Sequence, residues 1–192
     1  MMAMDVKEAL HARLTVVRAA LLAAVEGAGE HELRRPATPT GTNLIGLVKH
    51  LIGVEHVYLC ESFGRPTPDV LPWNEDGSVW EGADMWARAD ESSDEILALY
   101  RRACAASDAT IDALDLDSPA RVPHWPVEKA DTTLGFLLVW VVAETAQHAG
   151  HAEILRELAD GRTGSDTATS ATDWTTYVAR IQAAADQHAP PR

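Results

Sequence analysis

Side chains of the kinds that bind metals interrupt an apolar segment at residues 134–158, LGFLLVWVVAETAQHAGHAEILREL. The polar residues are Glu144, His148 and His151. Because each residue of an α-helix turns the chain by about 100°, residues three, four and seven positions apart share a face, and these three share one with apolar residues such as Leu137. A carboxylate buried among apolar groups costs several kcal/mol unless it is protonated, paired or bound to a cation. The rest of the sequence has to show which of these three states applies to Glu144.

Glu144 and His148 are four residues apart, so a carboxylate oxygen and an imidazole nitrogen can converge on one ion. His50 is the other histidine that the sequence places on an apolar helix face, far from Glu144 along the chain. A set of two histidines and one glutamate leaves positions open for water or substrate, as catalytic zinc sites do. Zinc is expected first, but nickel or iron would also suit these ligands. His151, one turn further on, is a candidate for a fourth ligand, for a partner of a ligand or for a proton shuttle.

Two alternatives need no such site. Glu144 and His148 could form a local hydrogen-bonded pair at a solvated edge, with His50 an ordinary core histidine, because an E-x-x-x-H pair alone is a weak signal. A ferritin-like di-iron protein would need Glu-x-x-His on each of two helices. The helix predicted around His50 has no such motif, so this alternative is disfavoured.

Four long helices are predicted to position these residues. Capping boxes at Asp5 with Glu8 and at Ser92 with Glu95 indicate two helix starts. The expected helices run from Asp5 to Gly27, from Thr42 or Asn43 to about Phe63, from Ser92 to about Leu114, and from Asp131 or Thr132 to Gly161. A short helix is expected from Trp174. No alternating pattern of useful length indicates a strand.

Loops are expected between these helices, at residues 28–42, 64–92 and 115–129, because each of these segments contains prolines. Three tryptophans in the 64–92 segment (Trp73, Trp80 and Trp86) predict that it packs against the helices. The fold class is therefore all-α: a four-helix bundle, up-down-down-up, with its long crossover between the second and third long helices. One domain is expected over 1–192, with its core at about 5–185.

Composition narrows the classes of function. The chain has 192 residues and a net charge of −13, so binding to nucleic acids or anionic membranes is not expected. Two cysteines, Cys60 and Cys104, form no CxxC motif and are predicted to be reduced thiols. Because the amino terminus lacks a signal-peptide pattern and no apolar run approaches the roughly 20 residues of a membrane span, we expect a soluble, cytoplasmic protein.

Two segments resemble the DinB-like superfamily, in particular its branch similar to mycothiol-dependent maleylpyruvate isomerase: GTNLIGLVKHLIGVEHVYL and ETAQHAGHAEILRELADG. The resemblance implies a metal-binding four-helix bundle, often a homodimer, with the metal on His50, Glu144 and His148. The glutamate at position 144 resembles the isomerase branch, whose members also have glutamate at this position, whereas many other members of the superfamily have histidine there. Because that isomerase carries a further carboxyl-terminal domain, its own substrate is not expected here.

The resemblance also implies that the metal activates a low-molecular-weight thiol, such as mycothiol or bacillithiol, for transfer or isomerisation with an electrophilic substrate. The runner-up is a non-catalytic metal-binding stress or interaction protein of the same fold. Small and apolar residues facing away from the ligands predict either a homodimer interface or burial under the tryptophan-bearing loop; they are Val139, Val142, Ala143, Ala146 and Gly150.

Overall fold

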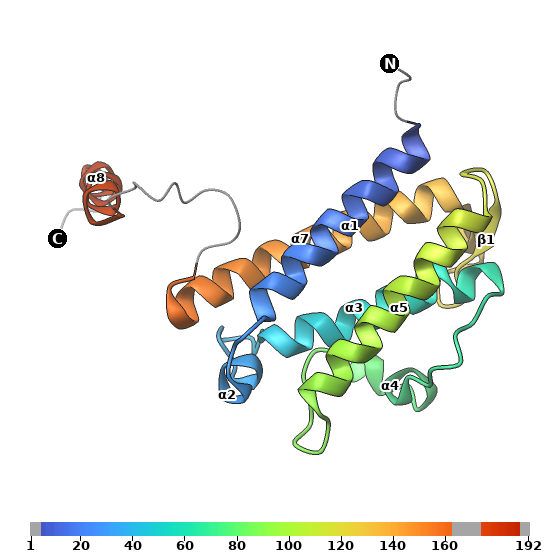
Figure 1. The fold of residues 1–192 in the computed structure, drawn as a ribbon, viewed down its shortest axis with the longest axis horizontal. Coiled ribbons are helices and arrows are strands. Elements are labelled where there is room, and N and C mark those ends of the chain that lie inside the picture. The colour runs from blue at the N-terminus through green and yellow to red at the C-terminus, as the bar shows by residue number, and fades with distance from the viewer. Residues whose placement is uncertain (1–4, 163–173, 189–192) are drawn as a thin grey trace.

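The structure, a computed structural model, describes residues 5–162 and 174–188. Four long helices form a bundle (Figure 1): α1 Val6–Val25, α3 Leu44–Leu59, α5 Ser93–Ala113 and α7 Leu134–Asp160. The predicted caps are present, since Asp5 with Glu8 forms a capping box and the Ser92 hydroxyl accepts from the backbone N–H of Glu95. Gly161, with φ 75°, ends α7 in the left-handed conformation that glycine adopts readily. The all-α bundle is confirmed.

Contacts near the helix ends give the helix directions. Arg156, late in α7, donates to the carbonyl oxygens of Ala24 and Glu26 at the end of α1, at 2.9 and 2.8 Å. These two helices therefore run parallel. At the other end of α7, the ring of Trp140 lies 6.4 Å from the ring of Tyr58, in the last turn of α3. The helix α3 is therefore antiparallel to α7.

The helices α3 and α5 run parallel, as the long crossover permits. Lys49, early in α3, contacts Glu91 just before α5 at 2.8 Å. Cys60, just after α3, lies with its sulfur 3.9 Å from the hydroxyl of Ser107, well along α5. These directions together give the predicted up-down-down-up topology.

Short elements in the loops correct several expectations. The 28–42 segment contains helix α2, Glu30–Arg34, where Arg34 pairs with Glu30 one turn away. The crossover contains α4, Pro72–Glu75, and the 3-10 helix η2, Ser78–Glu81. The third loop contains α6, Val127–Ala130. Prolines limited these segments to single turns without preventing helix formation.

Two short strands were not predicted. β1, Pro119–Arg121, pairs antiparallel with β2, Asp131–Thr133. Three residues are too few for an alternating pattern to be read from sequence. Helix α7 consequently begins at Leu134. The backbone N–H groups of Leu134 and Gly135 donate to the carbonyl oxygens of Ser118 and Leu116 in the preceding loop. The helix α3 ends at Leu59 rather than Phe63, and the 3-10 helix η1, Glu61–Phe63, follows it.

The outward face of α7 corrects a further expectation. Val142 and Ala146 are half-buried against the core, whereas Val139 is 53% exposed. The tryptophan-bearing loop therefore does not cover Val139. Near the start of α7 it is Trp125, from the 115–129 segment, that packs against Trp140, with ring centroids 5.7 Å apart.

A buried ion pair crosses the apolar core. Arg18 of α1 donates to both carboxylate oxygens of Glu55 of α3 at 2.7 and 2.6 Å, and to Asp108 of α5 at 2.6 Å. Glu55 is fully buried. The arginine therefore joins three helices while satisfying a charge that would otherwise be costly to bury.

The carboxyl-terminal helix α8, Trp174–Asp186 (Figure 1), confirms the short helix expected from Trp174. All of its residues are exposed. Within residues 5–162 and 174–188, no helix is both long and apolar enough to cross a membrane.

Candidate metal centre

The structure brings together the three residues that the sequence proposed as metal ligands. His50 comes from α3 and Glu144 and His148 from α7, and one ligand atom from each lies within 4.8 Å of the others. Nε2 of His50 is 3.5 Å from Oε1 of Glu144, and Nε2 of His148 is 3.3 Å from the same oxygen. Ligands about 2.1 Å from a tetrahedral ion are about 3.4 Å apart. The donor set and its spacing therefore fit a divalent metal.

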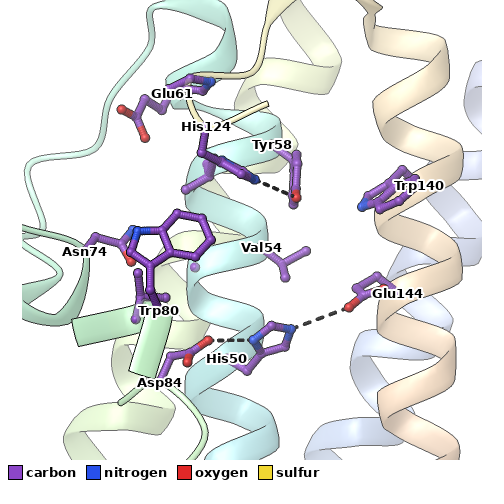
Figure 2. Close-up of a pocket in the computed structure, with 14 residues that line it drawn as sticks. His50, Val54, Tyr58, Glu61, Asn74, Trp80, Asp84, His124, Trp140 and Glu144 are labelled. Atoms are coloured by element: carbon purple, nitrogen blue, oxygen red, sulfur yellow. Dashed lines mark hydrogen bonds and ion pairs between the residues drawn. The ribbon is translucent and has the colours of Figure 1, made fainter. Parts of the chain in front are cut away.

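Asp84 orients His50, and sequence reasoning missed it. Its Oδ2 lies 2.7 Å from Nδ1 of His50 (Figure 2). A carboxylate on one ring nitrogen fixes the proton there and leaves the lone pair of Nε2 free to face Glu144. Burial alone would lower the pKa of His50, but the hydrogen bond and charge of Asp84, with a further contribution from Glu144, raise it. Asp84 belongs to no motif, so its only sequence signal was its place in the loop expected to pack down.

Lys49 anchors the loop segment that carries Asp84. This buried lysine, next to His50 in sequence, donates through Nζ to the backbone oxygens of Ala83 and Trp86 at 2.8 and 3.1 Å. It also contacts the carboxylate of Glu91 at 2.8 Å. One side chain thus fixes the backbone on both sides of Asp84, and the sequence had given no reason to single it out.

A close backbone approach holds the same segment against α3. Asn43, the N-cap of α3, donates through its side-chain amide to the carbonyl oxygen of Met85 at 3.0 Å. A Cβ added at Gly46 would lie 1.9 Å from that oxygen. Glycine is therefore required at this position for the loop to lie where it does.

His148 has features of a ligand. Its ring is 4.9 Å from that of His50, in an edge-to-face arrangement. Burial lowers the pKa of His148, and the neighbouring charge of His50 adds to the effect. A lowered pKa favours the neutral imidazole, which is the form that binds metals. Its buried Nδ1 has no hydrogen-bond partner among the described residues.

The burial of the triad, which is the cluster of His50, Glu144 and His148, differs from the expected pattern. Glu144 is 31% exposed, and Trp140 and Leu158 on the same predicted stripe are 42% and 70% exposed. The ligand residues therefore lie at the edge of the buried face of α7 rather than within it. His151 is exposed and lies outside the cluster of ligand atoms, although its ring is 5.7 Å from that of His148.

A cavity of about 370 Å³ opens beside the triad (Figure 2). Of the three tryptophans of the crossover, Trp80 lines this cavity, whereas Trp73 is buried and Trp86 lies outside the lining. The side chains that define its shape and charge are Val54, Tyr58, Glu61, Trp80, Asp84, His124, Trp140 and Glu144. A cavity of this volume that is open on one side can admit a small molecule to the triad.

An all-α four-helix bundle with a His–Glu–His cluster between α3 and α7 defines the structural class of the chain. Residues 9–161 match the family model described as Mycothiol-S-transferase, and the chain belongs to that family, which is DinB-like. This confirms the superfamily indicated by the two helical segments.

A solved structure supports the fold. The chain resembles a protein described as the conserved protein of locus from Enterococcus faecalis, with a TM-score of 0.61 at 14% identity, over 83% of this chain and 100% of the other. At that identity the likeness supports the fold alone. No curated protein sequence matches the chain.

Proposed function

We propose that the protein is a metal-dependent transferase that joins a low-molecular-weight thiol of the mycothiol type to a small electrophile. The observation that carries the proposal is the convergence of His50, Glu144 and His148 at the edge of an open cavity. Membership of a family described as Mycothiol-S-transferase supports the thiol. An isomerase of the same class would use the same site, adding the thiol and later releasing it.

A divalent ion bound to the triad would lower the pKa of a thiol in the cavity, so that thiolate forms at neutral pH. The residues of the chain have separate roles in this chemistry. Asp84 holds the ring of His50 so that Nε2 faces the ion site. Glu144 contributes negative charge, and the cavity wall positions the electrophile. In the transfer, a sulfur–carbon bond forms and the leaving group departs with its bonding electron pair, while the thiol proton goes to solvent.

The cysteines of the chain do not supply the nucleophile. Cys60 is fully buried, and neither Cys60 nor Cys104 lines the cavity. Burial raises the pKa of both thiols, and at Cys104 the charge of Glu55 adds to the increase. A thiol that stays protonated is a poor nucleophile. The reactive sulfur therefore has to come from a small molecule.

Metal analysis tests the site. We expect the purified protein, loaded with zinc and dialysed, to retain one ion per chain and His50→Ala to retain almost none. His56→Ala is the matched control, because His56 lies on the same helix but bonds to Thr67, 3.0 Å away, and is not part of the triad. Equal metal content in all three proteins would show that His50 does not help to bind the metal and would contradict the proposed site.

Turnover separates the transferase from the runner-up, a non-catalytic metal-binding stress or interaction protein. The metal-loaded protein should conjugate mycothiol with a simple electrophile faster than the His50→Ala variant does. Retention of metal without conjugation of either mycothiol or bacillithiol would favour the non-catalytic alternative.

A further inference from the structure

Aromatic rings form a continuous arc along the cavity. Trp80 lies 5.8 Å from His124, His124 lies 5.6 Å from Tyr58, and Tyr58 lies 6.4 Å from Trp140, measured between ring centroids. These residues come from η2, from the loop after β1, from α3 and from α7, and in Figure 2 Trp80 and Trp140 lie on either side of Val54. Residues far apart in sequence thus contribute to one surface.

The two tryptophans of this arc remain open to solvent. Trp80 is 74% exposed and Trp140 is 42% exposed. Large aromatic side chains gain most by covering their faces, and they prefer offset-stacked or edge-to-face contact with another ring. The exposed faces at the cavity therefore suit a planar ring in the ligand.

The charge of the cavity excludes one class of ligand. Glu61, Asp84 and Glu144 line it, and none of the described residues in its lining is lysine or arginine. A divalent ion would offset two of these three carboxylates. Glu61, which lies toward the end of the cavity away from His50 in Figure 2, would still repel an anion. Close to the ion, where the electrophile has to meet the thiolate, a positively charged group would in turn be repelled by the ion.

We infer that the electrophile is an uncharged molecule with an aromatic ring, which binds against Trp80 and Trp140. The inference rests on the proposed function of the same site and names its second substrate by class. It also gives a physical reason against a dicarboxylic acceptor such as maleylpyruvate. In a representative reaction with 1-chloro-2,4-dinitrobenzene, the thiolate attacks the ring carbon that bears chlorine, a carbon–sulfur bond forms, and chloride leaves with the bonding pair.

Binding without thiol tests the ligand class independently of turnover. Isothermal titration calorimetry on the full chain, with and without zinc, would compare methyl 3,5-dinitrobenzoate with 3,5-dinitrobenzoate, which share a ring and differ in charge. The ester should bind at least about tenfold more tightly in both states. Equal or tighter binding of the carboxylate in either state, or of a cationic analogue by the zinc-loaded protein, would overturn the inference.

Two variants locate the ligand. Trp80→Ala should weaken binding of the ester about fivefold or more, because a stacking face is lost. Trp86→Ala is the matched control, since Trp86 is an exposed tryptophan of the same loop that does not line the cavity. Glu61→Lys should bring the affinities of ester and carboxylate closer together. Equal effects of the two tryptophan variants would overturn the placement.

Conjugation assays separate failure of this inference from failure of the proposed function. With mycothiol, the protein should accelerate the conjugation of methyl 4-chloro-3-nitrobenzoate, relative to its uncatalysed rate, more than that of 4-chloro-3-nitrobenzoate. Equal accelerations for the two acceptors would contradict the inference without contradicting the transferase. Ester-selective binding without any conjugation would contradict the transferase and still support an aromatic, uncharged ligand.

Discussion

The contact between Asp84 and His50 determines which imidazole nitrogen faces Glu144. With Nδ1 of His50 2.7 Å from the aspartate, the Nε2 lone pair points to the cluster of ligand atoms. Partners of this kind fix the orientation of a metal-binding histidine and raise its basicity. The orientation of the His50 ring thus depends on a residue 34 positions away in the chain.

We predict that Asp84→Asn lowers zinc affinity by about 10- to 100-fold, because the neutral amide removes the charge that supports His50. Competition with a chromophoric chelator would measure the change. Asp90→Asn is the control, since Asp90 lies in the same loop but pairs with the exposed Arg88. An affinity for Asp84→Asn equal to that of the control would contradict the role of Asp84.

The buried pair of Arg18 and Glu55 gives a second residue-scale prediction. Arg18→Met should lower the free energy of unfolding by about 3–5 kcal/mol, because it leaves the fully buried Glu55 carboxylate without its partner. Arg18→Met combined with Glu55→Leu should recover most of the loss, since no buried charge is then unpaired. Urea denaturation would compare the two. A double variant no more stable than the single one would show that the pair itself carries the stability.

At the scale of elements, α3 contributes to the site in two ways. One face supplies His50, Val54 and Tyr58 to the cavity, and Lys49 holds the segment with Asp84. Helix α7 supplies the other two candidate ligands, Glu144 and His148, from the edge of its buried face. The geometry of the site therefore depends on how closely the crossover approaches α3.

Two glycines of α3 form a matched pair for testing that approach. Gly46→Ala should destabilise the protein, because the new Cβ would lie 1.9 Å from the carbonyl oxygen of Met85 and the backbone has to move. Gly53→Ala meets nothing within 4 Å and should stabilise the helix by up to about 1 kcal/mol. Thermal unfolding of both variants would measure the difference. Equal shifts in the same direction would contradict the close packing of the loop.

At the scale of the whole molecule, the outward face of α7 is unusually apolar. Val139 and Ile154 are 53% and 58% exposed, and Phe136 and Leu158 are exposed beside them. Large apolar side chains exposed along one face of a helix can mark an interface. The homodimer expected from the sequence stays a prediction, and this face is where we place it.

We predict that Ile154→Glu converts a dimer to a monomer in sedimentation velocity, because a charge would be buried without a partner at the interface. Val127→Glu is the control, since Val127 is also highly exposed but lies on α6. A wild-type protein that is monomeric at tens of micromolar would contradict the prediction.

The sequence by itself determined the four long helices and the candidate ligand set. Helical periodicity and capping residues such as Asp5 and Ser92 are local signals, because they depend on hydrogen bonds and faces within a few residues. Glu144 and His148 were predictable as a pair for the same reason. His50 was a candidate because it lies on a second apolar face, and the resemblance to the DinB-like superfamily then implied it as the third ligand.

Only the tertiary structure decided what surrounds the triad. Asp84, Lys49 and Trp80 act through contacts with residues 34 positions away or more, or across a cavity, and no local period encodes such contacts. The strands β1 and β2 could not be predicted from the sequence either, since three residues paired across a loop are too few to show an alternating pattern of apolar and polar residues. The edge position of Glu144 also followed from packing, because the helices around α7 determine which part of its apolar stripe is covered. Local physics therefore determined the candidate ligands, and long-range packing determined their support, their exposure and the cavity beside them.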